Sequence, residues 1–138
     1  MRLWSKNLIT TLPSKQLISQ WREIMAIIGS IKKKGFPNHI LVNKIMNYPL
    51  NHFSSYCKIV TDEIIKRGYK INKKKIIYVY EFCGEPNIWF CDIYIGWHND
   101  EYIKICLYNM YEKYICGGIS KKEWDIVMNN YAYFFEIL

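Results

Sequence analysis

The residues of this chain that could do chemistry together lie near its start and on one helix. They are the α-amine of Met1, the guanidinium of Arg2, and the adjacent pair Arg22 and Glu23. An α-amino group ordinarily has a pKa of about 7.7–8.0, so a useful fraction is neutral near pH 7. A neutral amine can attack the anomeric carbon of a sugar and form an imine, and a nearby carboxylate can transfer protons and stabilise the developing positive charge. Spacing alone does not distinguish this arrangement from an ordinary Arg-Glu pair on the surface of a helix.

The helix that must present Glu23 is predicted to begin after Pro13. Ser14 can cap its free amides, and Gly29 can end it in a left-handed conformation. At 100° per residue Glu23 lies nearly opposite the centre of the apolar stripe, with Gln16 and Gln20 nearby, so we expect it to be accessible. The residues of the stripe are Leu17, Trp21, Ile24, Met25 and Ile28.

Charge divides the chain into two halves of opposite sign. Residues 1–75 carry 15 Lys or Arg and 3 Asp or Glu, a formal charge of +12, whereas residues 76–138 carry 4 and 9, a charge of −5. A basic face attracts phosphates, because neutralising them releases condensed counterions. The charge predicts a polyanionic partner, most simply DNA, although a basic surface without a partner would give the same counts.

The remaining pattern predicts an all-α fold: a compact single-domain bundle of about five helices over residues 1–138, with an irregular central segment. Hydrophobic residues make up 51% of the chain, which excludes disorder. The central segment 69–96 is expected to be loop with at most one short strand or helix, since IIYVYEF is strand-like. The other expected helices lie at 38–46 after a cap at Asn38, from Pro49 to Gly68, from Asn99 to Gly117, and after the capping box of Ser120 and Glu123.

Several function classes are excluded by missing motifs. The sequence has no Gly-rich phosphate loop, no His-Glu-x-x-His, no Gly-x-Ser-x-Gly and no EF-hand loop. Its five cysteines lack zinc-type spacing and its three histidines lie far apart, so we expect reduced thiols, no metal and no organic cofactor. With no signal peptide and no long apolar run, we expect a cytoplasmic monomer, in a bacterium or in a cell infected by a DNA virus, that makes no membrane contact.

Several stretches of residues 1–70 resemble the pyrimidine-dimer DNA glycosylase family, the family of phage-type endonuclease V. These stretches are QLISQWRE (16–23) before a basic cluster, PNHILVNK (37–44), HFSSY (52–56) and KRGY (66–69). The chain is most similar to short members that begin Met-Arg-Leu-Trp and that also share WHND (97–100) and EKYICGGIS (112–120).

The resemblance implies an all-α enzyme without a cofactor. It would use its N-terminal amine to attack the sugar of a damaged nucleotide in double-stranded DNA, and would then break the strand by β-elimination. Carried over by position, Met1 supplies the amine and Glu23 the required carboxylate. By the same resemblance Arg2 and Arg22 hold phosphates, and Lys32 and Lys33 hold the DNA backbone.

The residues therefore leave three hypotheses. The leading one is a DNA glycosylase with abasic-site lyase activity, acting on pyrimidine dimers or another base lesion. The second is a nucleic-acid-binding module without catalysis, which would keep its salt-dependent affinity when Glu23 is substituted. The third is an imine-forming enzyme that acts on another glycoside, such as a modified nucleotide or RNA.

Overall fold

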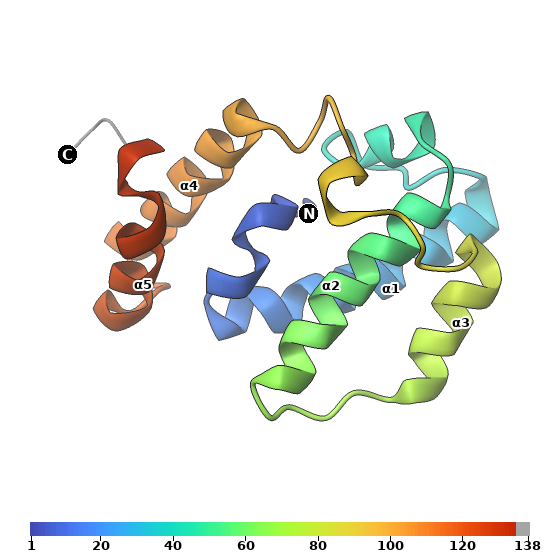
Figure 1. Cartoon of the computed structure of the whole chain (residues 1–138), viewed down its shortest axis with the longest axis horizontal. Coiled ribbons are helices and arrows are strands. Elements are labelled where there is room, and N and C mark those ends of the chain that lie inside the picture. The colour runs from blue at the N-terminus through green and yellow to red at the C-terminus, as the bar shows by residue number, and fades with distance from the viewer. Residues whose placement is uncertain (135–138) are drawn as a thin grey trace.

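The computed structural model describes residues 1–134, and these residues form helices and loops without a strand (Figure 1). The all-α prediction is confirmed, and the number of long helices matches the expected five. The α-helices are α1 (Ser14–Lys34), α2 (Asn51–Lys66), α3 (Lys73–Cys83), α4 (Asp100–Ile115) and α5 (Lys121–Tyr131). Short 3-10 helices cover Lys6–Thr11 (η1), Asn43–Asn47 (η2), Phe90–Asp92 (η3) and Ala132–Phe134 (η4).

The helices form two groups with the start of the chain between them (Figure 1). α2 packs against both α1 and α3, and α4 packs against α5. Residues 3–12 carry buried side chains that join the core, and η1 packs against α2. The N-terminal segment is therefore packed between the two groups of helices, and this packing fixes the position of Met1.

Helix α1 is longer than its sequence predicted. Gly29 does not end it, because Ile31 continues the buried face one further turn and nothing forces a left-handed conformation at Gly29. The helix ends instead at Gly35, which adopts φ 86°, a conformation that favours glycine. Ser14 does not cap the helix either, since no side-chain cap is formed there.

The central segment contains one helix, as the expectation of loop with at most one short strand or helix allowed, although its residues are strand-like. α3 runs through IIYVYEF and begins with Asn72, whose side chain accepts a hydrogen bond from the amide of Lys74. It buries Val79 and Cys83 against α2. Capping and packing on a neighbouring helix thus override the β preference of branched and aromatic residues. The irregular parts are residues 69–72 and residues 84–99, and the second of them includes η3.

Other helix ends are mostly as predicted. Gly68 follows α2 with φ 91°, Asn99 caps α4 through the amide of Tyr102, and Ser120 and Glu123 form the capping box of α5. The cap predicted at Asn38 is wrong. That residue adopts φ 60°, and the following residues form a turn and then η2 rather than an α-helix.

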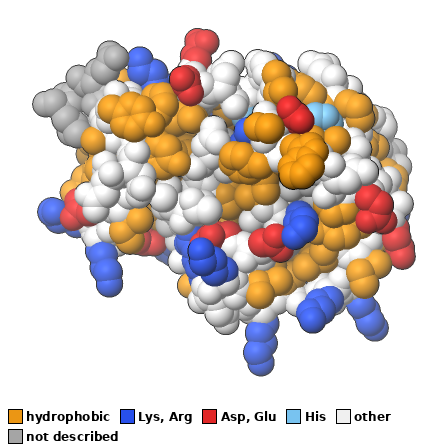
Figure 2. All heavy atoms as spheres, in the orientation of Figure 1, with side chains coloured by type: hydrophobic (Ala, Val, Ile, Leu, Met, Phe, Trp, Pro, Cys, Tyr) orange, Lys and Arg blue, Asp and Glu red, His pale blue; other side chains and the backbone are white. Residues whose placement is uncertain are grey.

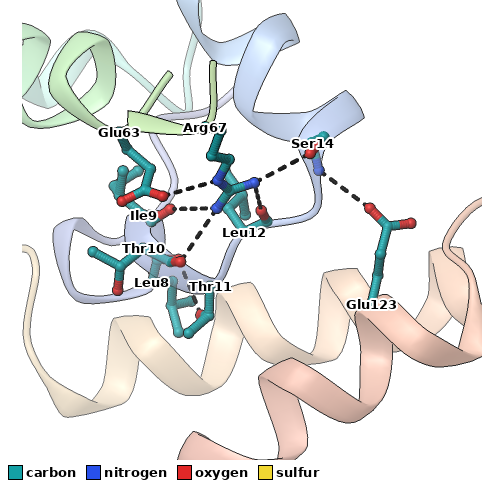
Figure 3. A network of polar contacts seen from close by, with 9 residues as sticks. All are labelled: Leu8, Ile9, Thr10, Thr11, Leu12, Ser14, Glu63, Arg67 and Glu123. Atoms are coloured by element: carbon teal, nitrogen blue, oxygen red, sulfur yellow. Dashed lines mark hydrogen bonds and ion pairs between the residues drawn. The ribbon is translucent and has the colours of Figure 1, made fainter. Parts of the chain in front are cut away.

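Arg67, at the end of α2, ties three segments together (Figure 3). Its guanidinium pairs with Glu63 at 2.9 Å and donates to the carbonyl of Leu12 at 2.7 Å. It also donates to the carbonyls of Ile9 and Thr10 and to Ser14 Oγ. These bonds satisfy carbonyls at the end of η1, where helix ends leave acceptors free. Arg67 therefore fixes the connection between the N-terminal segment and α1.

Candidate functional site

A cavity of about 390 Å³ lies where the start of the chain meets α1 and α4. This volume is within the range of about 300–1,000 Å³ typical of small-molecule clefts. Met1, Arg2 and Trp4 line it from the N-terminal segment, and Glu23 lines it from α1. The remaining lining residues are Gln16, Ser19, Leu41, Asn109 and Lys113. The structure thus brings three of the six predicted site residues, Met1, Arg2 and Glu23, to one cavity.

The orientation of the Glu23 carboxylate depends on Gln20, a fully buried side chain one turn earlier on α1. Gln20 Nε2 donates to Glu23 Oε2 at 3.3 Å and to the carbonyl of Arg2 at 3.0 Å. Its Oε1 accepts from the amide of Trp4 at 2.7 Å. One amide group therefore holds both the backbone next to Met1 and the carboxylate of Glu23, and its donors and acceptor are all used.

Tyr56, from α2, completes this network. Its hydroxyl lies 2.6 Å from the carbonyl of Trp4 and 2.9 Å from Gln20 Oε1. Burial raises the pKa of Tyr56 well above its usual value, and nearby groups including Glu23 raise it further. The hydroxyl therefore stays protonated and donates. The backbone N–H and C=O groups of Trp4 are both hydrogen-bonded, which leaves the start of the chain little freedom.

The amine of Met1 makes no hydrogen bond or ion pair with Glu23 within residues 1–134, and the cavity lies between them. Met1 is partly exposed and Glu23 is half-buried. The accessibility expected for Glu23 is therefore only partial, because the helix face that carries it turns toward the N-terminal segment. Gln20, which neighbours Glu23 on that face, is fully buried for the same reason.

Arg2 is half-buried on the α4 side of the cavity. Its guanidinium lies 5.5 Å from the centre of the Trp4 ring, an attractive contact between a cation and an aromatic face. Burial raises the pKa of Tyr102 and of Cys106, and the Arg2 guanidinium beside them opposes both rises. A fixed positive charge thus lies in the wall of the cavity.

Arg22 points to a neighbouring surface rather than into the cavity. It is exposed and lines a groove with Lys15 and Tyr69. Gln16 and Ser19 line both the groove and the cavity, so the two are contiguous. The Oε1 atom of Gln16 is buried and has no hydrogen-bond partner in the described part of the chain. A ligand that fills the cavity could therefore continue past Gln16 toward Arg22.

Lys32 and Lys33 lie in the last turn of α1, exposed to solvent. At about 1.5 Å per residue they are roughly 13 Å along the helix from Glu23. The ammonium of Lys32 lies 4.4 Å from the ring centre of Tyr78 and 5.1 Å from that of Phe82, both on α3. The structure does not bring Lys32 and Lys33 to the cavity. Their distance from Glu23 along the helix equals about four base-pair steps of DNA.

Sequence reasoning gave no sign of the cavity residues that lie outside the N-terminal segment and α1. Asn109 and Lys113 come from α4, and Leu41 comes from the turn before η2. Asn109 and Lys113 are four residues apart and so share one face of their helix. Lys113 falls within EKYICGGIS, a stretch noted for its resemblance, but nothing in the local pattern connects it with Glu23. Only the packing of α4 beside the N-terminal segment does so.

Three further properties of residues 1–134 bear on function: metal binding, cysteine reactivity and membrane-spanning helices. No three His, Cys, Asp or Glu side chains there lie close enough together to hold a metal ion. Of the five free cysteines, Cys57, Cys83 and Cys106 are buried, and burial raises the pKa of Cys57 to about 12 and that of Cys83 to about 11. None of the helices described has the length and apolar character needed to cross a membrane.

Comparisons with known proteins give one match. The model of the pyrimidine dimer DNA glycosylase family matches residues 1–77. The matched part contains η1, α1 and α2, and with them the residues from Met1 to Lys33 that the resemblance had assigned. No curated protein and no solved structure matches the chain.

Proposed function

Since the family model covers more than half of the chain, this protein belongs to the pyrimidine dimer DNA glycosylase family, and we propose that it is a glycosylase and abasic-site lyase acting on damaged double-stranded DNA. The family resemblance found in the sequence is thereby confirmed. The lesion we favour is the pyrimidine dimer. The nucleophile is the amine of Met1, and Glu23 is the group that moves protons beside it.

The proposed reaction proceeds through a covalent imine. The neutral amine attacks C1′ of the damaged nucleotide, the new N–C1′ bond forms, and the C1′–base bond breaks with its electrons leaving on the base, which takes up a proton. The lone pair of the bound nitrogen then expels O4′, which takes up a proton as the C1′–O4′ bond opens, and the C1′=N imine results. The Glu23 carboxylate takes up a proton released from the amine and stabilises the cationic sugar. Loss of a proton from C2′ then expels the 3′ phosphate by β-elimination, and water releases the protein from the sugar.

One observation carries the proposal: Met1 and Glu23, 22 positions apart, line the same cavity, and the buried amide of Gln20 donates both to Glu23 and to the carbonyl of Arg2, the residue after Met1. Holding a nucleophile and a proton-transfer group in a fixed relation to one sugar is a large part of what such a reaction needs. Arg2 and Lys113 in the cavity walls supply positive charge for the phosphates that flank the nucleotide.

The proposal is tested by trapping the imine. The protein is incubated with duplexes that contain a pyrimidine dimer or an abasic site, and borohydride is added to reduce any imine to a stable amine. We expect a covalent protein–DNA adduct whose modified residue, found by mass spectrometry, is Met1. An otherwise identical sample with its α-amine acetylated should give no adduct.

Three results would count against the mechanism in different ways. If neither substrate gives an adduct while binding falls with salt, the protein is a nucleic-acid-binding module. If the adduct maps to a lysine, the nucleophile is assigned wrongly. If undamaged RNA releases a base and dimer-containing DNA does not, the substrate is wrong and the third hypothesis stands.

A further inference from the structure

Exposed hydrophobic side chains are concentrated in the segment between α1 and α2. Phe36, Ile40, Leu41 and Met46 all belong to the exposed large hydrophobic residues of the described chain. Ile40, with 85% of its surface exposed, is the most exposed of them. Single exposed apolar side chains need no explanation, but several in eleven residues indicate a contact surface.

The backbone that carries Ile40 and Leu41 is held in a fixed turn. The amide of His39 donates to Asn43 Oδ1 at 3.0 Å, and the amide of Leu41 donates to His39 Nδ1 at 3.2 Å. The amides of Val42 and Asn43 both donate to the carbonyl of His39, and the side chain of Val42 is fully buried. The turn is therefore anchored on the core while its two apolar side chains point outward.

This turn borders the cavity. Leu41 lines it together with Met1 and Glu23, and Ile40 is the preceding residue on the exposed side. A second exposed apolar surface, which includes Trp89, lies over the segment between α3 and α4 (Figure 2). That segment contributes no residue to the cavity. Of these two exposed apolar surfaces, the turn at 39–43 is the one that borders the candidate active site, which Met1 and Trp4 also line.

The charge around the turn selects the partner. Between Glu23 and Asp62 the chain has no acidic residue, but it has five lysines. Three of these, Lys32 to Lys34, are exposed at the end of α1, and Lys44 is exposed just after the turn. A surface that combines apolar tips with lysines and lacks carboxylates is complementary to stacked bases flanked by phosphates.

From these observations we propose that Ile40 and Leu41 form a wedge that enters the base stack at the lesion. The proposal rests on the proposed function and adds how the damaged nucleotide is brought to Met1. Apolar side chains inserted between base steps unstack them and kink the duplex. Ile40 fills the space beside the displaced nucleotide, and Leu41 lies against that nucleotide in the cavity. The wedge is needed on duplex DNA and not on a single strand, whose bases are already unstacked.

The test compares two substrates and four proteins, the unsubstituted chain and three variants. Ile40→Ser and Leu41→Ala are made in the full chain. The matched control is Ile115→Ser, because Ile115 is 61% exposed and follows Lys113 by two positions, about 200° around α4 and so away from the cavity. Borohydride trapping rates are measured on an abasic site in a duplex and on the same site in a single strand.

We expect Ile40→Ser to slow trapping on the duplex by about 10- to 100-fold while the single-strand rate stays within about twofold. Leu41→Ala should slow it less, and Ile115→Ser should change neither rate. As a readout that needs no chemistry, 2-aminopurine placed next to the lesion should brighten when the unsubstituted protein binds and brighten less with Ile40→Ser.

Equal rates for Ile40→Ser and the unsubstituted protein on the duplex would overturn the wedge, as would an equal loss on both substrates. If Ile40→Ser loses binding to anionic phospholipid vesicles while its trapping rates on DNA are unaffected, the surface contacts a membrane instead. A failure of the proposed function looks different: the unsubstituted protein then gives no adduct even on the single strand, and the 2-aminopurine signal still reports whether the wedge unstacks DNA.

Discussion

The middle and the C-terminal end of α1 serve different purposes and are built differently. Glu23 and Arg2 are half-buried, and the buried side chain of Gln20 connects Glu23 to the backbone of Arg2 and Trp4 by hydrogen bonds. Around Lys33 and the turn that follows, the charged and apolar side chains are exposed on a fixed backbone. Chemistry requires groups held within a fraction of an ångström, whereas holding a DNA backbone requires charge and reach. The five predictions below separate these two requirements.

The largest effect is expected at Glu23, in the middle of the helix. Glu23→Gln keeps the shape of the side chain and removes its ability to accept a proton, so we expect the single-turnover rate on abasic duplex DNA to fall by about 10²- to 10⁴-fold. Affinity for the duplex should change little, because Glu23 carries no attractive charge for phosphates. The control is Glu81→Gln on α3, an exposed position that should be silent.

The next largest effect is expected on stability, from loss of the Arg67 network that anchors the N-terminal segment. Arg67→Ala leaves Glu63 buried without its partner and frees the carbonyls of η1, so we expect the free energy of unfolding to fall by about 3–5 kcal/mol. Lys58→Ala, which removes an exposed pair with Asp62, should cost at most about 0.5 kcal/mol. Urea unfolding measures both, and equal shifts would contradict the assignment.

Gln20 should show a positioning effect of intermediate size. Gln20→Leu keeps the volume and removes the hydrogen bonds to Arg2, Trp4 and Glu23, so the amine and carboxylate lose their common support. We expect a rate about 100-fold lower at saturating DNA with nearly unchanged affinity, since misplacement by about 1 Å has this effect. A thermal melt followed by circular dichroism must show that the variant is folded; a purely structural role would leave the rate of the folded fraction unchanged.

A pH effect is expected from His98, which packs beneath the N-terminal segment. Burial lowers its pKa from 6.5 to about 3, and its Nδ1 accepts from the amide of Lys6 at 3.0 Å. At pH values between about 3 and 6.5, His98 is protonated in the unfolded chain and neutral in the native protein. The free energy of unfolding therefore falls as the pH is lowered through this range, by up to about 1.4 kcal/mol per pH unit.

Urea unfolding at pH 7, 5 and 4 measures that slope. His98→Asn keeps an acceptor for Lys6 and removes the titration, so its slope should be smaller. An unchanged slope would show that the acid sensitivity comes from other groups.

The smallest effect is expected at the charged end. Lys33→Ala removes one exposed positive charge, so the salt dependence of duplex binding, plotted as log K against log salt, should become shallower by about 0.9. Affinity should drop a few-fold and the rate at saturating DNA should not change. Lys121→Ala on α5, whose charge is paired with Asp125, is the control. A reduced rate at saturation would mean that this end also takes part in the chemistry.

Local patterns predicted most helices because their signals are local. The capping box at Ser120 and the stop at Gly68 need only neighbouring residues, and both are found as expected. The predictions failed at Ser14, at Gly29 and at Asn38. In residues 76–82 the sequence left strand and helix open, and packing against α2 decided for the helix, as packing outweighed a weak local preference at Gly29. The single-domain, monomeric and cytoplasmic expectations stay predictions.

The sequence by itself determined that this chain is helical, that its first half is basic, and that an Arg-Glu pair lies on its first long helix, because composition, periodicity and motif are properties of neighbouring residues. Tertiary structure alone decided that Met1 and Glu23 border one cavity, that Lys113 and Leu41 join them, and that Gln20 holds the arrangement. These relations join residues up to about a hundred positions apart, and the distance between such residues depends on how helices pack, which no local pattern encodes.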